Sequence, residues 1–187
     1  MNPHYATRAF EIAVAEYCGS RFAVSVNSCT AALLLCCAYH EVGEVEIPKL
    51  TYVGVAQSIL NAGGTVKFRD EDWQGAYRLE PYNIVDAARR FHASMHKRGD
   101  FTCISLHISK ICGCDQGGVI LHDDPIADPI LRKMRFDGRT EGILRATIRL
   151  HAVFIATFLR VWPRKLCGNS RPSRAGMPTF PGPTIQT

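Results

Sequence analysis

A lysine beside a glycine-containing turn is the first feature of this sequence that could do chemistry. The apolar run Thr102–Ile108 indicates a buried strand, Lys110 follows it, and Gly118–His122 indicates a second strand. A lysine desolvated at the end of a strand has a lowered pKa, and its neutral amine is a nucleophile for carbonyl carbons. The pattern therefore fits a Schiff-base lysine. It also fits an ordinary surface lysine at a hairpin turn.

A polar turn follows the first expected strand. Asn27-Ser28-Cys29-Thr30 separates the β-rich run Arg21–Val26 from the apolar helical run Ala31–Ala38. Backbone N–H groups and two hydroxyls at a helix N-terminus favour an anion such as phosphate. The alternative is an ordinary Ser or Thr cap of the helix.

Two more side chains stand at strand ends. Tyr52 lies on a strand-to-helix connection, where its ring could stack on a planar ligand or pack in the core. Asp86 ends the short apolar run Tyr82–Val85, where a carboxylate could face a ligand or cap a helix.

The elements that must position these residues alternate along the chain. Helices are expected over Tyr5–Tyr17, Ala31–Ala38, Val53–Leu60 and Asp124–Arg135, and strands over Arg21–Val26, Val45–Ile47, Thr65–Phe68, Tyr82–Val85, Thr102–Ile108 and Gly118–His122. Asp70–Tyr82 is polar and is expected to be irregular. This order predicts an α/β fold of three layers, α/β/α, with a mostly parallel central sheet. In such sheets ligands bind outside the carboxyl ends of the strands.

The first helix is expected to be amphipathic. Phe10, Val14 and Tyr17 recur at helical spacing, and Gly19 is expected to end the helix.

Length and composition indicate one domain with a tail. Of the 187 residues, 1–140 carry the α/β pattern, 141–162 are expected to contain a helix over Ile143–Trp162, and 163–187 form a flexible tail rich in Pro, Gly and Ser. The net charge of +5 comes with no long basic block, so a nucleic-acid surface is not expected.

The eight cysteines indicate a reducing compartment. Cys36 and Cys37 are adjacent in an apolar helix and Cys103 lies in an apolar strand, which is the usage of small buried hydrophobes rather than of disulfides. Cys112 and Cys114 lack a second pair at zinc-site spacing, so no metal site is expected. No signal peptide is expected, and arginines interrupt the apolar run 143–162, so no membrane span is expected either. Together these features predict a cytoplasmic protein.

In this order, the motifs resemble the DegT/DnrJ/EryC1/StrS family. They are Asn27-Ser28-Cys29-Thr30-Ala31, Thr51-Tyr52, Asp86-Ala87-Ala88, Ser105-Leu-His-Ile-Ser-Lys110 and Gly117-Gly118. Each is weak alone, but five in the family's order, with serine five residues before lysine, are specific. Family members are sugar aminotransferases that depend on pyridoxal 5′-phosphate (PLP) and have the fold type I of aspartate aminotransferase. The resemblance implies a truncated fold type I large domain over residues 1–140.

Residue roles follow from the resemblance, position by position. Lys110 matches the lysine that binds PLP covalently and moves the proton, and Asp86 matches the partner of the ring nitrogen. Ser28, Cys29 and Thr30 match the phosphate turn, Ser105 matches a second phosphate ligand, and Tyr52 matches the aromatic that stacks on the ring. The resemblance also implies an amino donor, usually glutamate, a nucleotide-linked keto sugar as acceptor, and a homodimer.

The sequence also departs from the family pattern. Cys29 stands where a glycine is usual, so its Cβ is expected to crowd the phosphate, and Arg89 stands where a glutamine is usual. Only about 16 residues separate Asp70 from Asp86, which implies the loss of one β-α unit. The family's smaller C-terminal domain is also missing. Three functions therefore remain open: a sugar aminotransferase, a PLP-binding pseudoenzyme or degenerate fragment without turnover, and a structural subunit.

Overall fold

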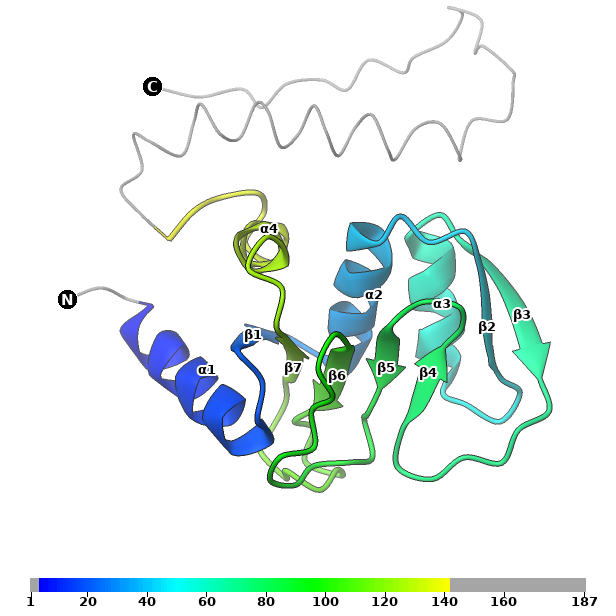
Figure 1. Ribbon diagram of the computed structural model, residues 1–187, viewed down its shortest axis with the longest axis horizontal. Helices are drawn as coiled ribbons and strands as arrows, with labels where there is room; N and C mark the ends of the chain where they lie inside the picture. The colour runs from blue at the N-terminus through cyan, green and yellow to red at the C-terminus, as the bar shows by residue number, and fades with distance from the viewer. Residues whose placement is uncertain (1–3, 142–187) are drawn as a thin grey trace, which may run out of the picture.

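The computed structural model describes residues 4–141 (Figure 1). The helix expected over Ile143–Trp162 and the tail over 163–187 lie outside the described residues. The elements are α1 Tyr5–Cys18, β1 Phe22–Val26, α2 Cys29–Tyr39, β2 Glu44–Pro48, α3 Val53–Asn61, β3 Thr65–Arg69, β4 Tyr77–Leu79, β5 Ile84–Asp86, β6 Phe101–Ser105, β7 Gly118–His122 and α4 Ala127–Arg135.

The strands form a five-stranded sheet of order β1-β7-β6-β5-β4 and a parallel pair, β2-β3. Reciprocal backbone hydrogen bonds between Glu46 and Glu80, of 2.8 and 3.1 Å, tie the pair to the larger sheet. The five-stranded sheet is mixed, which corrects the expected mostly parallel one: β5 and β6 are parallel, and the other neighbours are antiparallel. A parallel crossover needs about a dozen residues, and residues 80–83 between β4 and β5 are too few.

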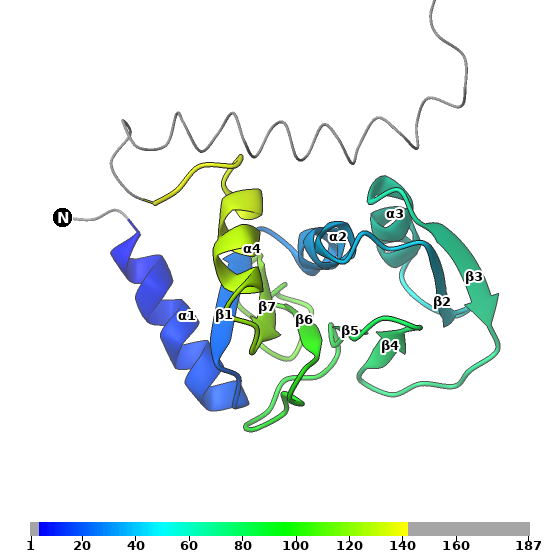
Figure 2. The same cartoon turned by 45° about the horizontal axis from the view of Figure 1, so that its top comes forward.

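The three expected layers are present. Helices α2, α3 and α4 lie on one face of the sheet (Figure 2) and bury a core with β5, β6 and β7. On the other face, α1 and the irregular segment 87–100 cover a second cluster that includes Cys18, Met95, Ile104 and Leu121. Because both faces of the sheet are covered, the residues at the ends of its strands lie along the edge between the two covering layers.

Helix α1 buries a different stripe from the one expected. Its buried residues are Glu11, Val14, Ala15 and Cys18, whereas Phe10 and Tyr17 are 36% and 49% exposed. The buried stripe follows the same helical spacing, displaced by one position, because Glu11 meets two arginines of α4. Gly19 ends the helix in the left-handed conformation at φ 78°, as expected.

Among the elements whose boundaries differ from the sequence expectation, β4, β6 and α4 differ for a visible physical reason. Strand β4 lies within the segment expected to be irregular, and β6 ends at Ser105 because the chain then turns back, with Leu106 N–H bonded to Gly117 O at 2.9 Å. Helix α4 begins at Ala127 rather than at Asp124, whose carboxylate accepts the Ile126 N–H at 2.7 Å. Within residues 4–141, no helix has the length and apolarity that crossing a bilayer requires.

Candidate active site

The turn after β1 presents backbone N–H donors at the start of α2. Ser28 caps the helix: its Oγ accepts the Ala31 N–H at 3.1 Å, and its carbonyl accepts the Ala32 N–H at 3.0 Å. The N–H groups of Cys29 and Thr30 come first in the helix, and no acceptor in residues 4–141 bonds them. Ser28 is thus a cap, and the same turn still offers two donors at the positive end of a helix.

Gly118 lets this turn approach the sheet. A Cβ on Gly118 would lie 2.4 Å from the Ser28 carbonyl carbon and 2.6 Å from the Cys29 nitrogen, so no larger residue fits there. Ser105 is paired with Gly118 across the β6–β7 ladder and is buried. The structure therefore brings Ser105 and Ser28, both expected phosphate ligands, to either side of one glycine.

A second glycine brings Tyr52 to Thr30. A Cβ on Gly54 would lie 2.5 Å from Tyr52 Cε1 and 3.2 Å from Thr30 Oγ1, so both side chains border the same point. The Tyr52 side chain is 69% exposed, which excludes the core position that the sequence left open. Its ring is available to a ligand bound over the α2 turn.

Asp86 is a buried carboxylate with uncharged hydrogen-bond donors. Its Oδ1 accepts the Ala88 N–H at 2.9 Å, and its Oδ2 accepts the Tyr77 hydroxyl at 2.9 Å. No helix follows it, since residues 87–100 are irregular, so it is not a helix cap. Burial raises the pKa of the Asp86 carboxyl, and the Ala88 N–H, the Tyr77 hydroxyl and the Lys110 ammonium offset only part of that rise. Such a site favours the arrival of a cation.

Cys29 points into the core rather than out toward a phosphate. The residue is buried, and its Sγ lies 4.0 Å from Asp86 Oδ1. The expected crowding by its Cβ is therefore absent on the outer side of the turn. Burial raises the pKa of the Cys29 thiol well above its ordinary value, and Asp86 adds to the rise, so the thiol stays neutral beside the carboxylate.

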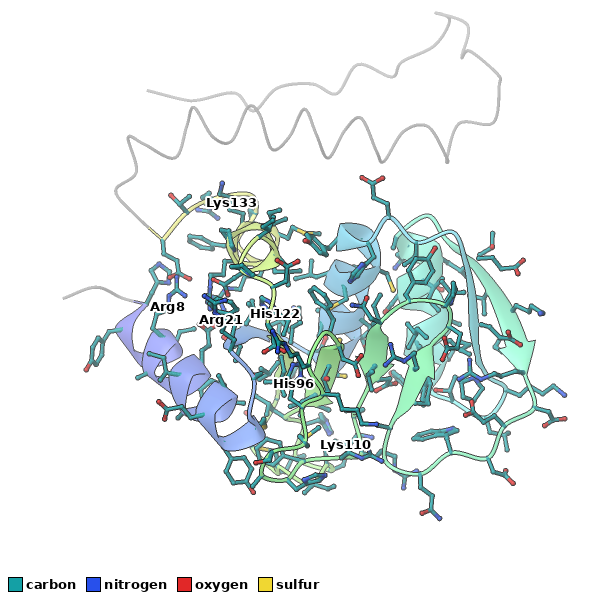
Figure 3. All side chains as sticks on the ribbon, viewed as in Figure 1. Arg8, Arg21, His96, Lys110, His122 and Lys133 are labelled. Carbon is teal, nitrogen blue, oxygen red and sulfur yellow. The ribbon has the colours of Figure 1, made fainter. Side chains whose placement is uncertain are left out.

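Lys110 lies in the turn between β6 and β7, farther from the strand end than expected. Its backbone N–H donates to His107 O at 2.8 Å and its carbonyl accepts the Gly113 N–H at 3.0 Å, so the turn is hydrogen-bonded on both sides of it. Within residues 4–141 no hydrogen bond or ion pair holds its ammonium, yet that charge acts on both Asp86 and Cys29. Figure 3 shows Lys110 at the edge of the molecule opposite Lys133.

Of the seven expected site residues, six lie at the α2 turn, beside it at Tyr52, or at the ends of β5 and β6, and Lys110 lies in the β6–β7 turn, from which its charge acts on Asp86 and Cys29. Two participants were not expected. Tyr77 comes from the segment expected to be irregular, and Thr51 Oγ1 lies 2.5 Å from the Tyr77 hydroxyl. The adjacency of Thr51 to Tyr52 was the one available signal, and nothing in the sequence pointed to Tyr77.

The part of the chain that precedes Ser105 and Lys110 matches a family model. Residues 4–89 match the DegT/DnrJ/EryC1/StrS aminotransferase family. The resemblance to that family is confirmed. The spore coat polysaccharide biosynthesis protein SpsC of Bacillus subtilis is 26% identical over 168 residues, covering 65% of this chain and 43% of SpsC. GDP-perosamine synthase of Caulobacter vibrioides is 39% identical over 66 residues, covering 34% of this chain and 18% of the synthase.

Two solved structures share the fold of this chain. The sugar aminotransferase CalS13 from Micromonospora echinospora has a TM-score of 0.64 at 18% identity, with 84% of this chain and 61% of CalS13 covered. NtdA from Bacillus subtilis, solved with bound cofactor PMP, has a TM-score of 0.59 at 15% identity, with 73% and 41% covered. These similarities establish fold type I. The chain spans less than half the length of the two curated relatives.

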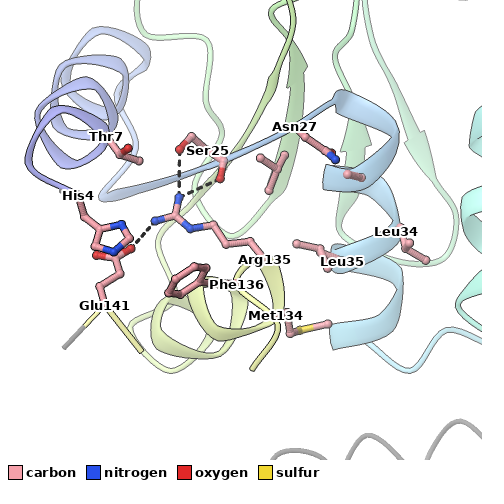
Figure 4. Close-up of a pocket in the computed structure, with 12 residues that line it drawn as sticks. His4, Thr7, Ser25, Asn27, Leu34, Leu35, Met134, Arg135, Phe136 and Glu141 are labelled. Atoms are coloured by element: carbon pink, nitrogen blue, oxygen red, sulfur yellow. Dashed lines mark hydrogen bonds and ion pairs between the residues drawn. The ribbon is translucent and has the colours of Figure 1, made fainter. Parts of the chain in front are cut away.

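A hollow of about 460 Å³ lies between α1, the end of β1, α2 and α4 (Figure 4). The arginine that lines it is already engaged. Arg135 donates to Ser25 O at 2.8 Å, to Ser25 Oγ at 3.0 Å and to Glu141 at 2.5 Å. This hollow is therefore lined by an ionic cluster that joins α1, β1 and α4.

Proposed function

We propose that this chain binds PLP at the candidate active site and transfers an amino group, from glutamate, to a keto sugar carried on a nucleotide. The names of the relatives support the substrate class, since one is a GDP-perosamine synthase and another acts in polysaccharide biosynthesis. PMP, the aminated form of PLP, is bound in the NtdA structure.

The site residues fit the parts of this cofactor. The α2 turn offers free N–H groups and the Ser28 and Thr30 hydroxyls to the phosphate, with Ser105 beside them. Tyr52 offers an exposed ring face, and Asp86 offers a carboxylate to the ring nitrogen. When bound, PLP supplies an electron sink for the carbanion at the substrate's α-carbon.

The chain's own residues then perform two tasks. The Asp86 carboxylate stabilises positive charge at the ring nitrogen, because ion pairing favours the charged forms of both partners. The Lys110 amine holds the cofactor and carries a proton to and from the reacting carbon. The observation that supports this assignment is the placement of Lys110, without an ion-pair partner in residues 4–141, within the electrostatic range of buried Asp86.

The decisive test is covalent labelling. Purified protein is mixed with PLP, its absorbance spectrum is recorded, and the complex is reduced with borohydride and mapped by peptide mass. Lys110 should carry the label. Lys110→Arg should lose it, whereas Lys133→Arg, on α4, should keep it. Label on Lys97 or Lys133 instead would contradict the assignment.

A half-reaction separates an enzyme from a cofactor-binding protein. Addition of glutamate to the PLP complex should convert its absorbance to that of PMP within a single turnover. A complex that forms on Lys110 but never converts would identify a pseudoenzyme.

We also propose that the chain forms a homodimer in the cytoplasm. Large apolar side chains stand exposed near the site, at Leu50, Tyr52 and Val53 before α3 and at Ile108 and Ile111 in the Lys110 turn, all 65–80% exposed. Exposed apolar surface of this kind favours association. Sedimentation at micromolar concentration should give a dimer, and a clean monomer that binds PLP tightly would contradict it.

The proposal that the chain works in the cytoplasm rests on its buried free cysteines, because such cysteines are typical of a reducing compartment.

A further inference from the structure

We infer that Tyr77 is a positioning residue for Asp86, and that a hydrogen-bonded chain from Thr51 through Tyr77 aims this carboxylate and favours its charged form. The inference rests on the proposed function, in which Asp86 faces the ring nitrogen of PLP. It concerns a residue outside the expected cofactor ligands.

The geometry fixes the direction of the chain. The Tyr77 hydroxyl lies 2.5 Å from Thr51 Oγ1 and 2.9 Å from Asp86 Oδ2. A phenol has one proton, and an ionised carboxylate only accepts, so Tyr77 donates to Asp86 and Thr51 donates to Tyr77. Hydrogen bonds in such a series polarise one another, so the Thr51 hydroxyl strengthens the bond that Tyr77 makes.

The fold holds Tyr77 at this point. Tyr77 is paired directly opposite Asp86 in the antiparallel β4–β5 ladder, so both side chains rise on one face. The Trp73 ring packs edge-on against Tyr77 at a centroid distance of 4.8 Å, and its Nε1 donates to Leu50 O at 2.8 Å. The segment that precedes β4 therefore fastens the turn that carries Thr51 and Tyr52. The aromatic over the ring and the carboxylate at its nitrogen are linked through one chain of contacts.

The groups around Asp86 show why Tyr77 matters. The titratable groups that act on it are Tyr77 from β4, Cys29 from α2, Cys103 from β6 and Lys110 from the following turn. Burial keeps the Tyr77 phenol and the two thiols neutral by raising the pKa of each. Among these groups Lys110 is the one that opposes the rise in the Asp86 pKa by charge alone, and it is the residue proposed to react. The charge of Asp86 therefore depends on its hydrogen bonds from Tyr77 and from the Ala88 N–H.

The test follows the Asp86 carboxyl directly, without cofactor. The protein is labelled with ¹³C at aspartate carboxyls, Asp86→Asn assigns the resonance, and its chemical shift is titrated. Tyr77→Phe should move the titration midpoint upward by about half to one pH unit, because the charged form loses a donor. Thr51→Val should move it in the same direction by less. Tyr39→Phe is the matched control, since Tyr39 donates to Asp124 Oδ2 at 3.1 Å in a different part of the fold.

The outcomes separate this inference from the proposed function. A midpoint unchanged in both Tyr77→Phe and Thr51→Val overturns it, and Thr51→Val alone decides if Tyr77→Phe fails to fold. PLP affinity should fall several-fold more in Tyr77→Phe than in Tyr39→Phe. If the midpoint moves as expected while wild-type protein binds no PLP, the hydrogen-bonded chain from Thr51 through Tyr77 to Asp86 is supported and the proposed function fails.

Discussion

Two buried carboxylates in this molecule have opposite surroundings. Glu11 on α1 is 3% exposed and Asp86 at the end of β5 is 6% exposed. Glu11 accepts from Arg132 at 2.6 Å, from Arg135, and from the Ser25 N–H at 2.9 Å. Asp86 accepts from the Tyr77 phenol, from the Ala88 N–H and, at 4.0 Å, from the Cys29 thiol, all of them uncharged donors.

The pKa shifts of the two groups differ in direction for this reason. Burial alone would raise the pKa of Glu11, but the Ser25 N–H and the two arginines outweigh it, and the pKa is lowered. At Asp86 the burial effect is larger than all the compensation, and the pKa is raised. A carboxylate with its own permanent cations holds elements together, whereas one without them is suited to receive a cationic ligand.

The Glu11 cluster has a clear structural role. Arg132 also donates to Asp128 at 2.8 Å and to Ala23 O at 3.0 Å, and Glu141 accepts from Arg8 at 2.8 Å. The network joins α1, β1 and α4, none of which supplies a ligand to the proposed cofactor. The comparison therefore predicts that removal of the Asp86 carboxylate impairs catalysis, whereas removal of the Glu11 carboxylate lowers stability.

The largest expected effect is on catalysis. Asp86→Ala should retain part of the PLP affinity through the α2 turn but slow the half-reaction with glutamate by roughly a thousandfold or more, because the positive ring nitrogen loses its partner. Single-turnover absorbance measures the rate. Glu11→Gln is the control, and its folded fraction should react at the wild-type rate. A normal rate in Asp86→Ala would refute the electron-sink role of this residue.

The next effect is on stability. Glu11→Gln leaves two half-buried guanidinium groups, Arg132 and Arg135, short of a counter-charge, and we expect the free energy of unfolding to fall by about 3 kcal/mol. Urea denaturation followed by circular dichroism measures it. Glu141→Gln, farther from the core in the same network, should cost less. A loss in Asp86→Ala as large as that in Glu11→Gln would remove the distinction between the two sites.

The sequence predicted the parts of the site that follow local rules. Strand, polar turn and helix around Ser28 are recognisable because a serine cap and an apolar run are both local. The family resemblance placed Lys110, Asp86 and Tyr52 in one site, and in the structure the Lys110 charge acts on Asp86 while Tyr52 lies beside Thr30 at the α2 turn.

What could not be predicted depends on distant partners. The burial of Glu11 requires Arg132 and Arg135, which lie 121 and 124 residues farther along the chain, so helical periodicity alone favoured Phe10 and Tyr17. Strand β4 has only three residues, lies in a polar segment, and is defined by its pairing with β5. The local sequence pattern therefore did not indicate a strand there. Tyr77 became visible as a partner of Asp86 only through that pairing.

The smallest expected effect, and the most direct test of the comparison, is the pH dependence of stability. Glu11 has an ordinary pKa of 4.5 that folding lowers, so its contribution to the free energy of unfolding is complete above that value and is lost as the pH falls through the folded pKa. Asp86 has an ordinary pKa of 3.8 that folding raises, so its contribution is complete below 3.8 and is lost as the pH rises through the folded pKa.

The stability difference between wild type and each variant should therefore change with pH in opposite directions for Glu11→Gln and Asp86→Asn. Urea denaturation of wild type, Glu11→Gln and Asp86→Asn is measured at a series of pH values on both sides of these ordinary pKa values. The stability of wild type minus that of Glu11→Gln should grow as the pH rises, and the stability of wild type minus that of Asp86→Asn should shrink, each by about 1.4 kcal/mol per unit of pKa shift. If both stability differences changed with pH in the same direction, hydrogen bonds and ion pairs would offset burial equally well at Glu11 and at Asp86. The electrostatic argument that Asp86 is suited to bind a cation would then fail.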